Sequence, residues 1–504
     1  MPGLSDLIEA GERVRNSGRW PRAKVAPPAW DAAARRLAEG RLTLLGLWGE
    51  PAGAHMALRD SQSGALGILS LDAVAGAYPS VARLHPPALR LERAIRDLYG
   101  LEPQGLPDAR PWLDHGAWGV CAPLGARANA ADAAPAYAFL GAEGEGLHQI
   151  PVGPVHAGII EPGHFRFAAN GETIVRLEVR LGYVHKGVEG LMSGADPRRA
   201  AQLAGRVSGD STVAYALAFA QAAESALQAE IPARAIWLRA LMAEMVRLAN
   251  HLGDIGAICN DASFALMHAH CGILREQALR AADAAFGHRL MRDAIAPGGV
   301  TRDLSLEGGA AIRALLAKIR RRLPRLIHLY DNTASLQDRT VGTGVLKPRL
   351  ARQYGAGGFV GRASGRAFDA RRDVGYAPYE KLSFEPQLLN EGDVNARVWI
   401  RIREIEQSLS LIEQILAQAP QGEVRIELAP AGEPRESMAL VEGFRGDVLV
   451  WLRLAADGSV ARCHLRDPSW FQWPLLEAVI EGNIVADFPL CNKSFNCSYS
   501  GHDL

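Results

Sequence analysis

The spacing of apolar and polar positions changes along the chain, and each spacing predicts a different kind of element. Residues 41–75 contain short apolar runs, RLTLLGLWGE and ALGILSLDA among them, separated by turn-forming residues. This pattern predicts β-strands with a hairpin at 61–64. The stretch PPALRLERAIRDLYG that follows predicts a helix. The beginning of the chain is therefore expected to form an α/β domain.

A segment rich in alanine, glycine and proline comes next, CAPLGARANAADAAPAYAFLGAEGEG. Its composition suits a linker better than a core element. We therefore predict a linker at 121–147, between an N-terminal domain of residues 1–120 and a second domain of residues 148–504.

The second domain has mainly helical spacing. Apolar residues recur at steps of three and four in two runs, which predicts two long helices with one buried stripe each. The first run contains Leu241, Met245, Leu248 and Leu252, and the second contains Val398, Ile402, Ile405, Leu409, Ile412 and Leu416. Glycine-rich irregular segments, APGGV and GAGGFVGRASG, lie between the helices, and 446–467 returns to strand-like alternation. The predicted fold class is α+β, with a mainly helical second domain.

Composition narrows the class of protein. The chain has 504 residues, with 55 Lys and Arg against 55 Asp and Glu. A formal net charge of zero argues against a nucleic-acid binder, which must neutralise many phosphates. No run approaches the ~18 apolar residues of a membrane span. The six cysteines are scattered, without a C-x-x-C pair, as in a cytosolic protein with reduced thiols. Any membrane association is expected to go through partner proteins.

The segment HQIPVGPVHAGIIEPGHFRF carries the first candidate residues, His148, His156, His164 and Glu161. Their spacing matches no zinc pattern. Glu161 lies between AGII and PG, which suggests a carboxylate in an apolar turn, where a raised pKa would suit proton transfer. The alternative is a hydrogen-bonded structural residue, and the spacing alone leaves both open.

Two further motifs have both a functional and a structural interpretation. In RLGYVHKGVEGLM, His185 and Glu189 are four positions apart, so they would share a helix face, and a solvated ion pair is the simpler explanation. In GRVSGDSTVAYALAFA, Ser208, Asp210 and Ser211 precede an apolar helix, where capping needs no further function.

The glycine-rich segment GFVGRASG is not a phosphate loop. It lacks the GK[ST] of a P-loop. Its glycines are expected to let the backbone turn tightly and to bring Arg362 and Asp369 toward the core.

Taken together, the motifs resemble a known family over nearly the whole chain. LERAIRDLYGLEPQGLPDARPWLDHG is similar to the signature of the complex I C subunit, although Leu106 replaces the usual histidine. The matching residues are Glu92, Arg93, Asp97, Gly100, Pro107, Asp108 and Arg110. From His148 onward the chain resembles the complex I D subunit and, more closely, the large subunit of membrane-bound group 4 [NiFe]-hydrogenases of the formate hydrogenlyase and hydrogenase-4 type. A fusion of C-like and D-like parts is typical of that branch.

The nickel-ligand positions depart from the resemblance. The hydrogenases hold nickel and iron by four cysteines, in R-x-C-G-x-C and P-C-x-x-C motifs. Here Ser208, Ser211, Ser498 and Gly501 stand at the four positions, and Cys497 falls one place early. Because soft thiolates hold these metals, we expect no [NiFe] centre.

The quinone-site residues of complex I are only partly present. His156 matches the first histidine of the quinone-binding motif, whereas the second falls at Ile160. Glu161 matches a glutamate that the hydrogenase relatives use for protons. Glu189 matches a residue of a magnesium site in some relatives, although His502 lies two residues too early to complete that site.

The resemblance implies a subunit of a membrane-associated respiratory oxidoreductase, of the NADH:quinone oxidoreductase or hydrogenase-4 type. It would couple electron transfer to ion translocation through His156, Glu161 and Asp210. No tightly bound cofactor is expected, quinone is the candidate ligand, and iron–sulfur clusters would reside in a small partner subunit. Antiporter-like membrane subunits complete the expected partners. The chain itself is expected in the cytoplasm, peripheral to the inner membrane. A non-catalytic scaffold is the alternative, and a working [NiFe]-hydrogenase is the third.

Overall fold

The computed structural model describes residues 3–126, 129–130 and 137–504. The N-terminal part is built on a five-stranded sheet with the order β1-β2-β5-β4-β3. β2 and β5 are parallel, and the other neighbours are antiparallel. The strands are β1 (Glu12–Arg13), β2 (Arg22–Lys24), β3 (Leu42–Glu50), β4 (Gly53–Asp60) and β5 (Leu66–Asp72). The predicted hairpin is confirmed, since β4 and β5 pair antiparallel on either side of residues 61–65.

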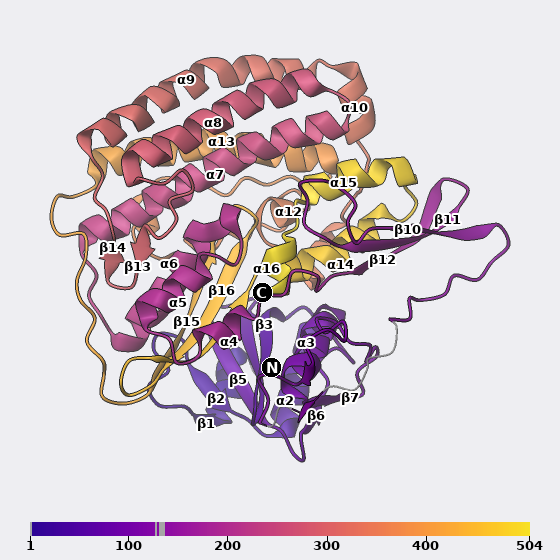
Figure 1. The fold of residues 1–504 in the computed structure, drawn as a ribbon, viewed down its shortest axis with the longest axis vertical. Coiled ribbons are helices and arrows are strands. Elements are labelled where there is room, and N and C mark those ends of the chain that lie inside the picture. The colour runs from indigo at the N-terminus through magenta and orange to yellow at the C-terminus, as the bar shows by residue number, and fades with distance from the viewer. Residues whose placement is uncertain (1–2, 127–128, 131–136) are drawn as a thin grey trace.

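Helices pack beside this sheet (Figure 1). The predicted helix is confirmed as α3 (Leu89–Tyr99), which follows a 3₁₀ turn and ends at Gly100 with a positive φ of 68°. The other helices of this part are α1 (Leu4–Glu9) and α2 (Pro27–Ala38). Short strands complete it, namely β6 (Ala77–Pro79), β7 (Glu102–Gln104), β8 (Val120–Cys121) and β9 (Asn129–Ala130).

A three-stranded antiparallel sheet extends sideways from the body (Figure 1). It consists of β10 (Leu147–Val152), β11 (His164–Asn170) and β12 (Thr173–Arg180). The loop between β10 and β11 carries His156 and Glu161. Of the predicted linker at 121–147, residues 127–128 and 131–136 lie outside the described residues, and the domain boundaries stay a prediction.

Four long helices lie side by side at the top of Figure 1. They are α7 (Ala233–Asp261), α8 (Ala265–Phe286), α9 (Leu306–Asp331) and α13 (Val394–Gln418). Both predicted apolar runs are confirmed, because they lie in α7 and α13 and their residues are largely buried. Each stripe of apolar side chains enters one large core. Among the described residues, no helix combines the length and apolar character needed to cross a membrane.

The C-terminal part returns to strands, as the alternation at 446–467 predicts. β15 (Arg435–Glu442), β16 (Asp447–Leu454) and β17 (Val460–Arg466) form an antiparallel sheet that packs against α6 (Thr212–Leu227). The chain then forms α14 (Ser469–Ile480), α15 (Phe488–Phe495) and α16 (Tyr499–Asp503). The remaining short elements include α4 (Val188–Met192), α5 (Pro197–Ala204), α10 (Ala334–Thr340), α11 (Pro348–Gln353), α12 (Gly358–Arg362), β13 (Ile295–Ala296) and β14 (Gly299–Val300).

The segment GAGGFVGRASG is partly helical, not irregular throughout, because it contains α12. Gly358 has a φ of +59°, and a Cβ there would lie 2.2 Å from the carbonyl oxygen of Arg445. Glycine therefore lets α12 approach the turn between β15 and β16. As expected, Arg362 and Asp369 are fully buried.

The N-terminal and C-terminal parts share a core. One cluster of buried apolar residues combines side chains of α2, α3 and β3 with side chains of α14 and α15. Ion pairs also cross between the parts, and each has a nitrogen–oxygen distance of 2.6 to 2.7 Å. These pairs are Arg22–Glu436, Arg90–Glu477 and Arg453–Glu50.

Candidate functional site

A cavity of about 420 Å³ opens where the β10–β11 loop, the segment before α6, the β15–β16 turn and the end of α15 meet. Its lining includes Glu161, Ser208, Asp210, Arg445 and Ser498. Three of the predicted site segments, far apart in sequence, therefore converge on one space.

An ion pair between Asp210 and Arg445 lies at the wall of this cavity. Two guanidinium nitrogens of Arg445 donate to the two carboxylate oxygens of Asp210, at 2.7 and 2.6 Å. The hydroxyls of Ser208 and Ser211 donate to the same carboxylate, at 2.8 and 3.2 Å. Burial alone would raise the pKa of Asp210, but the charge of Arg445 and these hydrogen bonds hold it below its usual value. The pair therefore stays charged at neutral pH.

Other contacts hold Arg445 in place. Its guanidinium lies 4.5 Å from the ring centre of Phe444, and its Nε donates to the carbonyl of Asn496. Its own carbonyl accepts from Gln472 at 2.8 Å. Asn496 in turn donates to Asp254 at 2.9 Å. The cation is thus fixed by α7, α14 and the segment before α16.

The four positions that the resemblance assigns to nickel ligands lie close together. The hydroxyl oxygens of Ser208 and Ser498 are 3.2 Å apart. Ser211 accepts from Arg445 at 3.2 Å, and Ser498 accepts from the backbone N–H of Gly501 at 2.9 Å. The hydroxyls that the sequence places at these positions therefore bond to one another and to the ion pair.

The residues present do not fit a [NiFe] centre. The donors are hydroxyls, where soft thiolates are needed, and a guanidinium cation stands among them. A Cβ on Gly501 would lie 2.5 Å from a carboxylate oxygen of Asp467, so a cysteine has no room there. Burial raises the pKa of the Cys497 thiol, which keeps it protonated and a poor ligand.

Glu161 and His156 face the C-terminal helix from the β10–β11 loop. A carboxylate oxygen of Glu161 accepts the backbone N–H of Ser500 at 3.0 Å. Glu161 is exposed, and is not enclosed in an apolar turn as its neighbours in the sequence suggest. The two ring nitrogens of His156 lie 3.1 Å from the carbonyl of Pro154 and 3.4 Å from the hydroxyl of Tyr499. Tyr499 lines the cavity, so it links His156 to that space.

The histidines of the β10–β11 region do not converge. His148 is exposed on β10, whereas His164 is buried beside the carbonyl of Gly153. Among residues 3–126, 129–130 and 137–504, no three His, Cys, Asp or Glu side chains form a group arranged to hold a metal ion.

Glu189 has other partners than the spacing suggests. Its carboxylate accepts from Arg462 at 2.8 Å and lies 2.8 Å from His464, with the Leu465 backbone N–H also donating at 3.1 Å. His185 precedes α4 and contacts the carbonyl of Asp503 instead. Because cationic and N–H donors already surround the carboxylate, this arrangement does not favour a magnesium ion.

A second cavity, of about 530 Å³, lies between α3, β3 and α4. Its lining is mostly apolar, with Leu98, Trp118 and Leu124 on one side and Lys186 and Glu189 on another. Neither His156 nor Glu161 reaches it. The two cavities are therefore separate candidates for a ligand.

Sequence reasoning missed Arg445, Asn496 and Tyr499. Arg445 stands in the short turn GFRGD between two strands, where a lone arginine gives no signal of a partner. Tyr499 directly follows Ser498 near the C-terminus, but only the fold places it beside His156.

In this architecture, a helical bundle and small sheets surround the 420 Å³ cavity. Family comparisons agree in three successive parts of the chain. Residues 66–132 match the 30 Kd subunit of respiratory-chain NADH dehydrogenase, 186–253 match nickel-dependent hydrogenase, and 265–437 match the 49 Kd subunit of that dehydrogenase. The predicted α+β fold, with a C-subunit-like part before a D-subunit-like part, is confirmed.

Individual relatives support the same family assignment. Formate hydrogenlyase subunit 5 of Escherichia coli is 32% identical over 86% of this chain and 78% of the relative. The carbon monoxide-induced hydrogenase of Rhodospirillum rubrum is 32% identical over 69% of this chain and 97% of the relative. A chain of the archaeal membrane-bound sulfane sulfur reductase has a TM-score of 0.67 at 26% identity, covering 71% of this chain and 99% of that one. The chain belongs to the family of complex I 49 kDa subunits and [NiFe]-hydrogenase large subunits, of hydrogenase-4 type.

Proposed function

We propose that this chain is the large subunit of a membrane-associated, complex I-related oxidoreductase that works without a [NiFe] centre. The proposal rests on the Asp210–Arg445 ion pair, which contacts the hydroxyls of Ser208 and Ser211 and lies beside Ser498, at positions that the resemblance assigns to nickel ligands. A fixed cation and hard oxygen donors oppose the binding of nickel and low-valent iron. In this proposal the site no longer performs hydrogen chemistry.

The electron acceptor would bind in the 420 Å³ cavity, with quinone as the candidate. Electrons would arrive from iron–sulfur clusters of a small partner subunit, and antiporter-like subunits would anchor the complex to the membrane on its cytoplasmic side. Reduction of a quinone takes two electrons and two protons and yields a quinol. In this proposal Tyr499, which lines the cavity, hydrogen-bonds a carbonyl oxygen of the quinone, His156 contacts the Tyr499 hydroxyl from outside the cavity, and Glu161, which also lines the cavity, carries protons.

The named activity of one structural relative supports an acceptor other than protons. The archaeal chain comes from a respiratory membrane complex named as a sulfane sulfur reductase, not as a hydrogenase. This name supports the proposal that the present chain serves a reduction other than that of protons.

A scaffold is the second candidate function. The hydroxyls of Ser208 and Ser211 are already bonded to Asp210, so the former ligand positions are closed by internal hydrogen bonds. A chain with this site would still present its surfaces to partner subunits.

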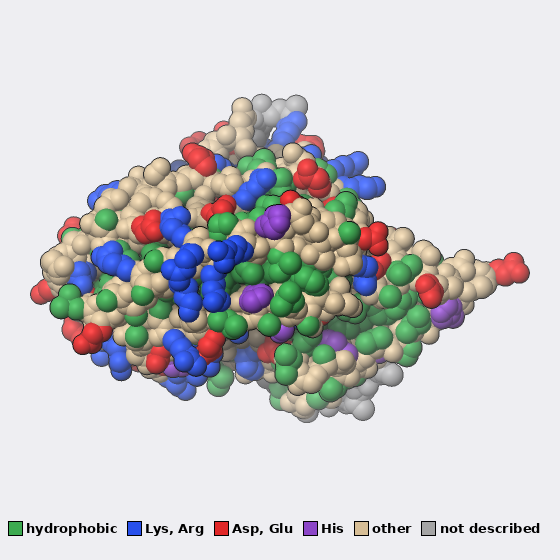
Figure 2. All heavy atoms as spheres, turned by 90° about the horizontal axis from the view of Figure 1, so that it is seen from above, with side chains coloured by type: hydrophobic (Ala, Val, Ile, Leu, Met, Phe, Trp, Pro, Cys, Tyr) green, Lys and Arg blue, Asp and Glu red, His purple; other side chains and the backbone are tan. Residues whose placement is uncertain are grey.

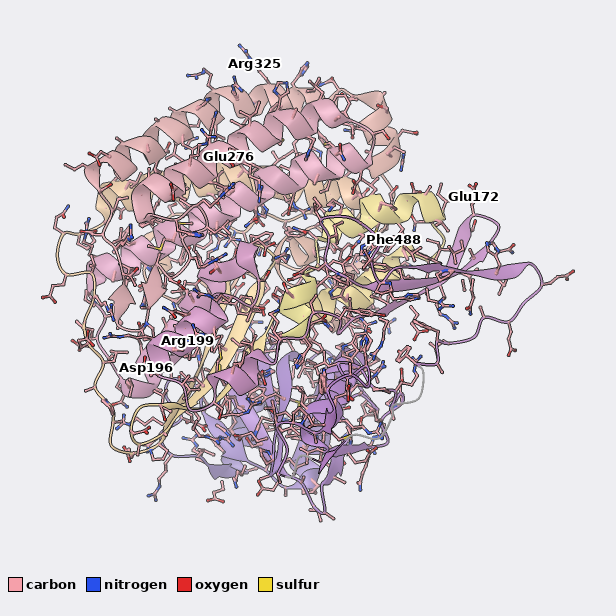
Figure 3. All side chains as sticks on the ribbon, in the orientation of Figure 1. Glu172, Asp196, Arg199, Glu276, Arg325 and Phe488 are labelled. Atoms are coloured by element: carbon pink, nitrogen blue, oxygen red, sulfur yellow. The ribbon has the colours of Figure 1, made fainter. Side chains whose placement is uncertain are left out.

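Two variants of the purified complex distinguish these functions. The assay follows re-oxidation of the dithionite-reduced partner clusters by decylubiquinone, with electron paramagnetic resonance as the readout. Glu161→Gln and Tyr499→Phe should each slow re-oxidation about 10²-fold or more with assembly unchanged, the range typical of lost acid–base groups. Glu172→Gln is the matched control, since Glu172 is exposed on the β11–β12 hairpin at the outer side of the molecule (Figure 3). Wild-type rates in both site variants would support the scaffold and refute the acceptor site.

A further inference from the structure

Four arginines surround a third cavity, which lies away from the site described above. The cavity has a volume of about 560 Å³ and lies between the end of α2, the edge of β3 and β4, and α11. Arg59, Arg349, Arg352 and Arg366 all line it. Its volume is in the range of small-molecule sites.

Three of these arginines have no counter-charge. Among the described residues, the guanidinium groups of Arg59, Arg349 and Arg352 have neither a hydrogen-bond acceptor nor an ion-pair partner. The Nε of Arg59 is in addition fully buried without an acceptor. A buried donor left unpaired costs free energy, so such a group indicates a missing acceptor.

The two inner arginines are held in position by Phe368. The guanidinium of Arg59 lies 5.2 Å from the ring centre of Phe368, and that of Arg366 lies 4.6 Å from it. Arg366 also donates to the carbonyl of Ala356 at 2.8 Å. Burial and the nearby charge of Arg59 lower the pKa of Arg366 to about 10, so Arg366 stays protonated at neutral pH. Two like charges are thus kept close together at the base of the cavity.

The acidic residues at this cavity already have partners. Glu39 pairs with Arg41 at 3.3 Å. Asp373 accepts from Arg372 at 3.0 Å and from the backbone N–H of Asp369 at 2.7 Å. Neither carboxylate forms an ion pair with any of the four arginines that line the space.

We propose that this cavity binds the phosphate group of a phosphorylated small molecule or lipid. A guanidinium matches phosphate oxygens in a bidentate way, and several guanidinium groups around one space suit a group with about two negative charges better than a single carboxylate. The recessed position of Arg59 favours a small group that enters a cavity over the flat acidic surface of a protein partner. The exposed side chains of Arg349 and Arg352 form the rim.

Inorganic pyrophosphate is the probe, titrated calorimetrically into the purified protein or its complex. Saturable binding is expected, and Arg352→Gln should weaken it about tenfold, because one charge-assisted hydrogen bond of about 1.4 kcal/mol is lost. Arg59→Gln should weaken it at least as much. Arg352 is exposed on α11, so its variant tests the site even where Arg59→Gln affects folding.

Arg325→Gln is the matched control. Lys and Arg side chains gather on the face that α9 covers, as seen from above in Figure 2. Arg325 points outward from α9 in Figure 3 and is exposed. This surface is basic but does not line the proposed phosphate cavity, so Arg325→Gln should leave pyrophosphate affinity unchanged. Equal losses in Arg325→Gln and Arg352→Gln would indicate general charge attraction and overturn the proposal, as would the absence of saturable binding.

Vesicles distinguish the two sources of phosphate. Co-sedimentation with phosphatidylcholine vesicles that contain phosphatidic acid, abolished by pyrophosphate and by Arg352→Gln, would identify a lipid headgroup. Pyrophosphate binding without co-sedimentation would identify a soluble phosphate compound. Loss of partner-subunit assembly in Arg352→Gln, with no pyrophosphate binding to the wild type, would show an acidic protein surface as the occupant and refute the phosphate site.

Discussion

Replacing Arg445 with methionine would remove the cation from the 420 Å³ cavity while keeping most of the side-chain volume. Asp210 would then keep only the hydroxyls of Ser208 and Ser211 as partners. A carboxylate that has lost its counter-charge in a partly buried position is destabilising, so the variant should be less stable than the wild type.

The magnitude follows from the exposure of the two groups. The Arg445 side chain is 6% exposed and the Asp210 side chain 33% exposed. Breaking a fully buried pair costs about 3–5 kcal/mol, whereas an exposed pair contributes about 0–1 kcal/mol. Since one partner is buried and the other is a third open to water, we expect a coupling energy of about 2 kcal/mol.

A double-mutant cycle measures this coupling. Arg445→Met, Asp210→Asn and the double variant are compared with the wild type by urea denaturation. The double variant should lose less stability than the sum of the single variants, because it leaves no unpaired charge. If the effects of the two single variants add to within about 0.5 kcal/mol, the ion pair is not coupled and the reasoning fails. Since the pKa of Asp210 is lowered in the folded state, its contribution should be present at neutral pH and lost as pH falls below the ordinary carboxyl range.

Three further predictions concern stability. Burial raises the pKa of Glu92 to about 7 from 4.5. The free energy of unfolding of the wild type should therefore fall by about 3 kcal/mol through this group as the pH rises from 4.5 to 7. Urea denaturation at several pH values should show a smaller fall in Glu92→Gln. Gly501→Cys should cost about 1–3 kcal/mol by the same method and should not restore nickel binding, because its Cβ meets Asp467; a stable variant would contradict the clash. Gly358→Ala should cost at least about 2 kcal/mol in thermal unfolding, since its φ is positive and its Cβ would meet the carbonyl of Arg445; an unchanged midpoint would refute this.

Local patterns were sufficient to predict several of the longer elements. The apolar steps of three and four in 241–252 and 398–416 correspond to buried faces of α7 and α13, because a helix shows its period within a few turns. The alternation at 446–467 corresponds to β16 and β17 for the same reason. Spacing did not predict where α4 begins. Gly187, with a φ of +65°, lies just before the first residue of α4, so His185 is outside the helix.

The partners of the site residues could not be predicted from spacing. Asp210 and Arg445 are separated by 235 positions, and Glu189 and His464 by 275. Only the packing of α6 and α4 against the C-terminal sheet brings these groups together. The resemblance assigned four positions to nickel ligands, and the structure places two of them, Ser208 and Ser498, with their hydroxyl oxygens 3.2 Å apart. It gave no sign that a cation would lie beside them.

The proposed function requires that this chain works without nickel. Its direct test is metal analysis by inductively coupled plasma mass spectrometry of the complex, purified with its partner subunits from cells supplied with nickel. Iron from the partner clusters is expected, with nickel far below one atom per chain. One nickel atom per chain would refute the proposed function.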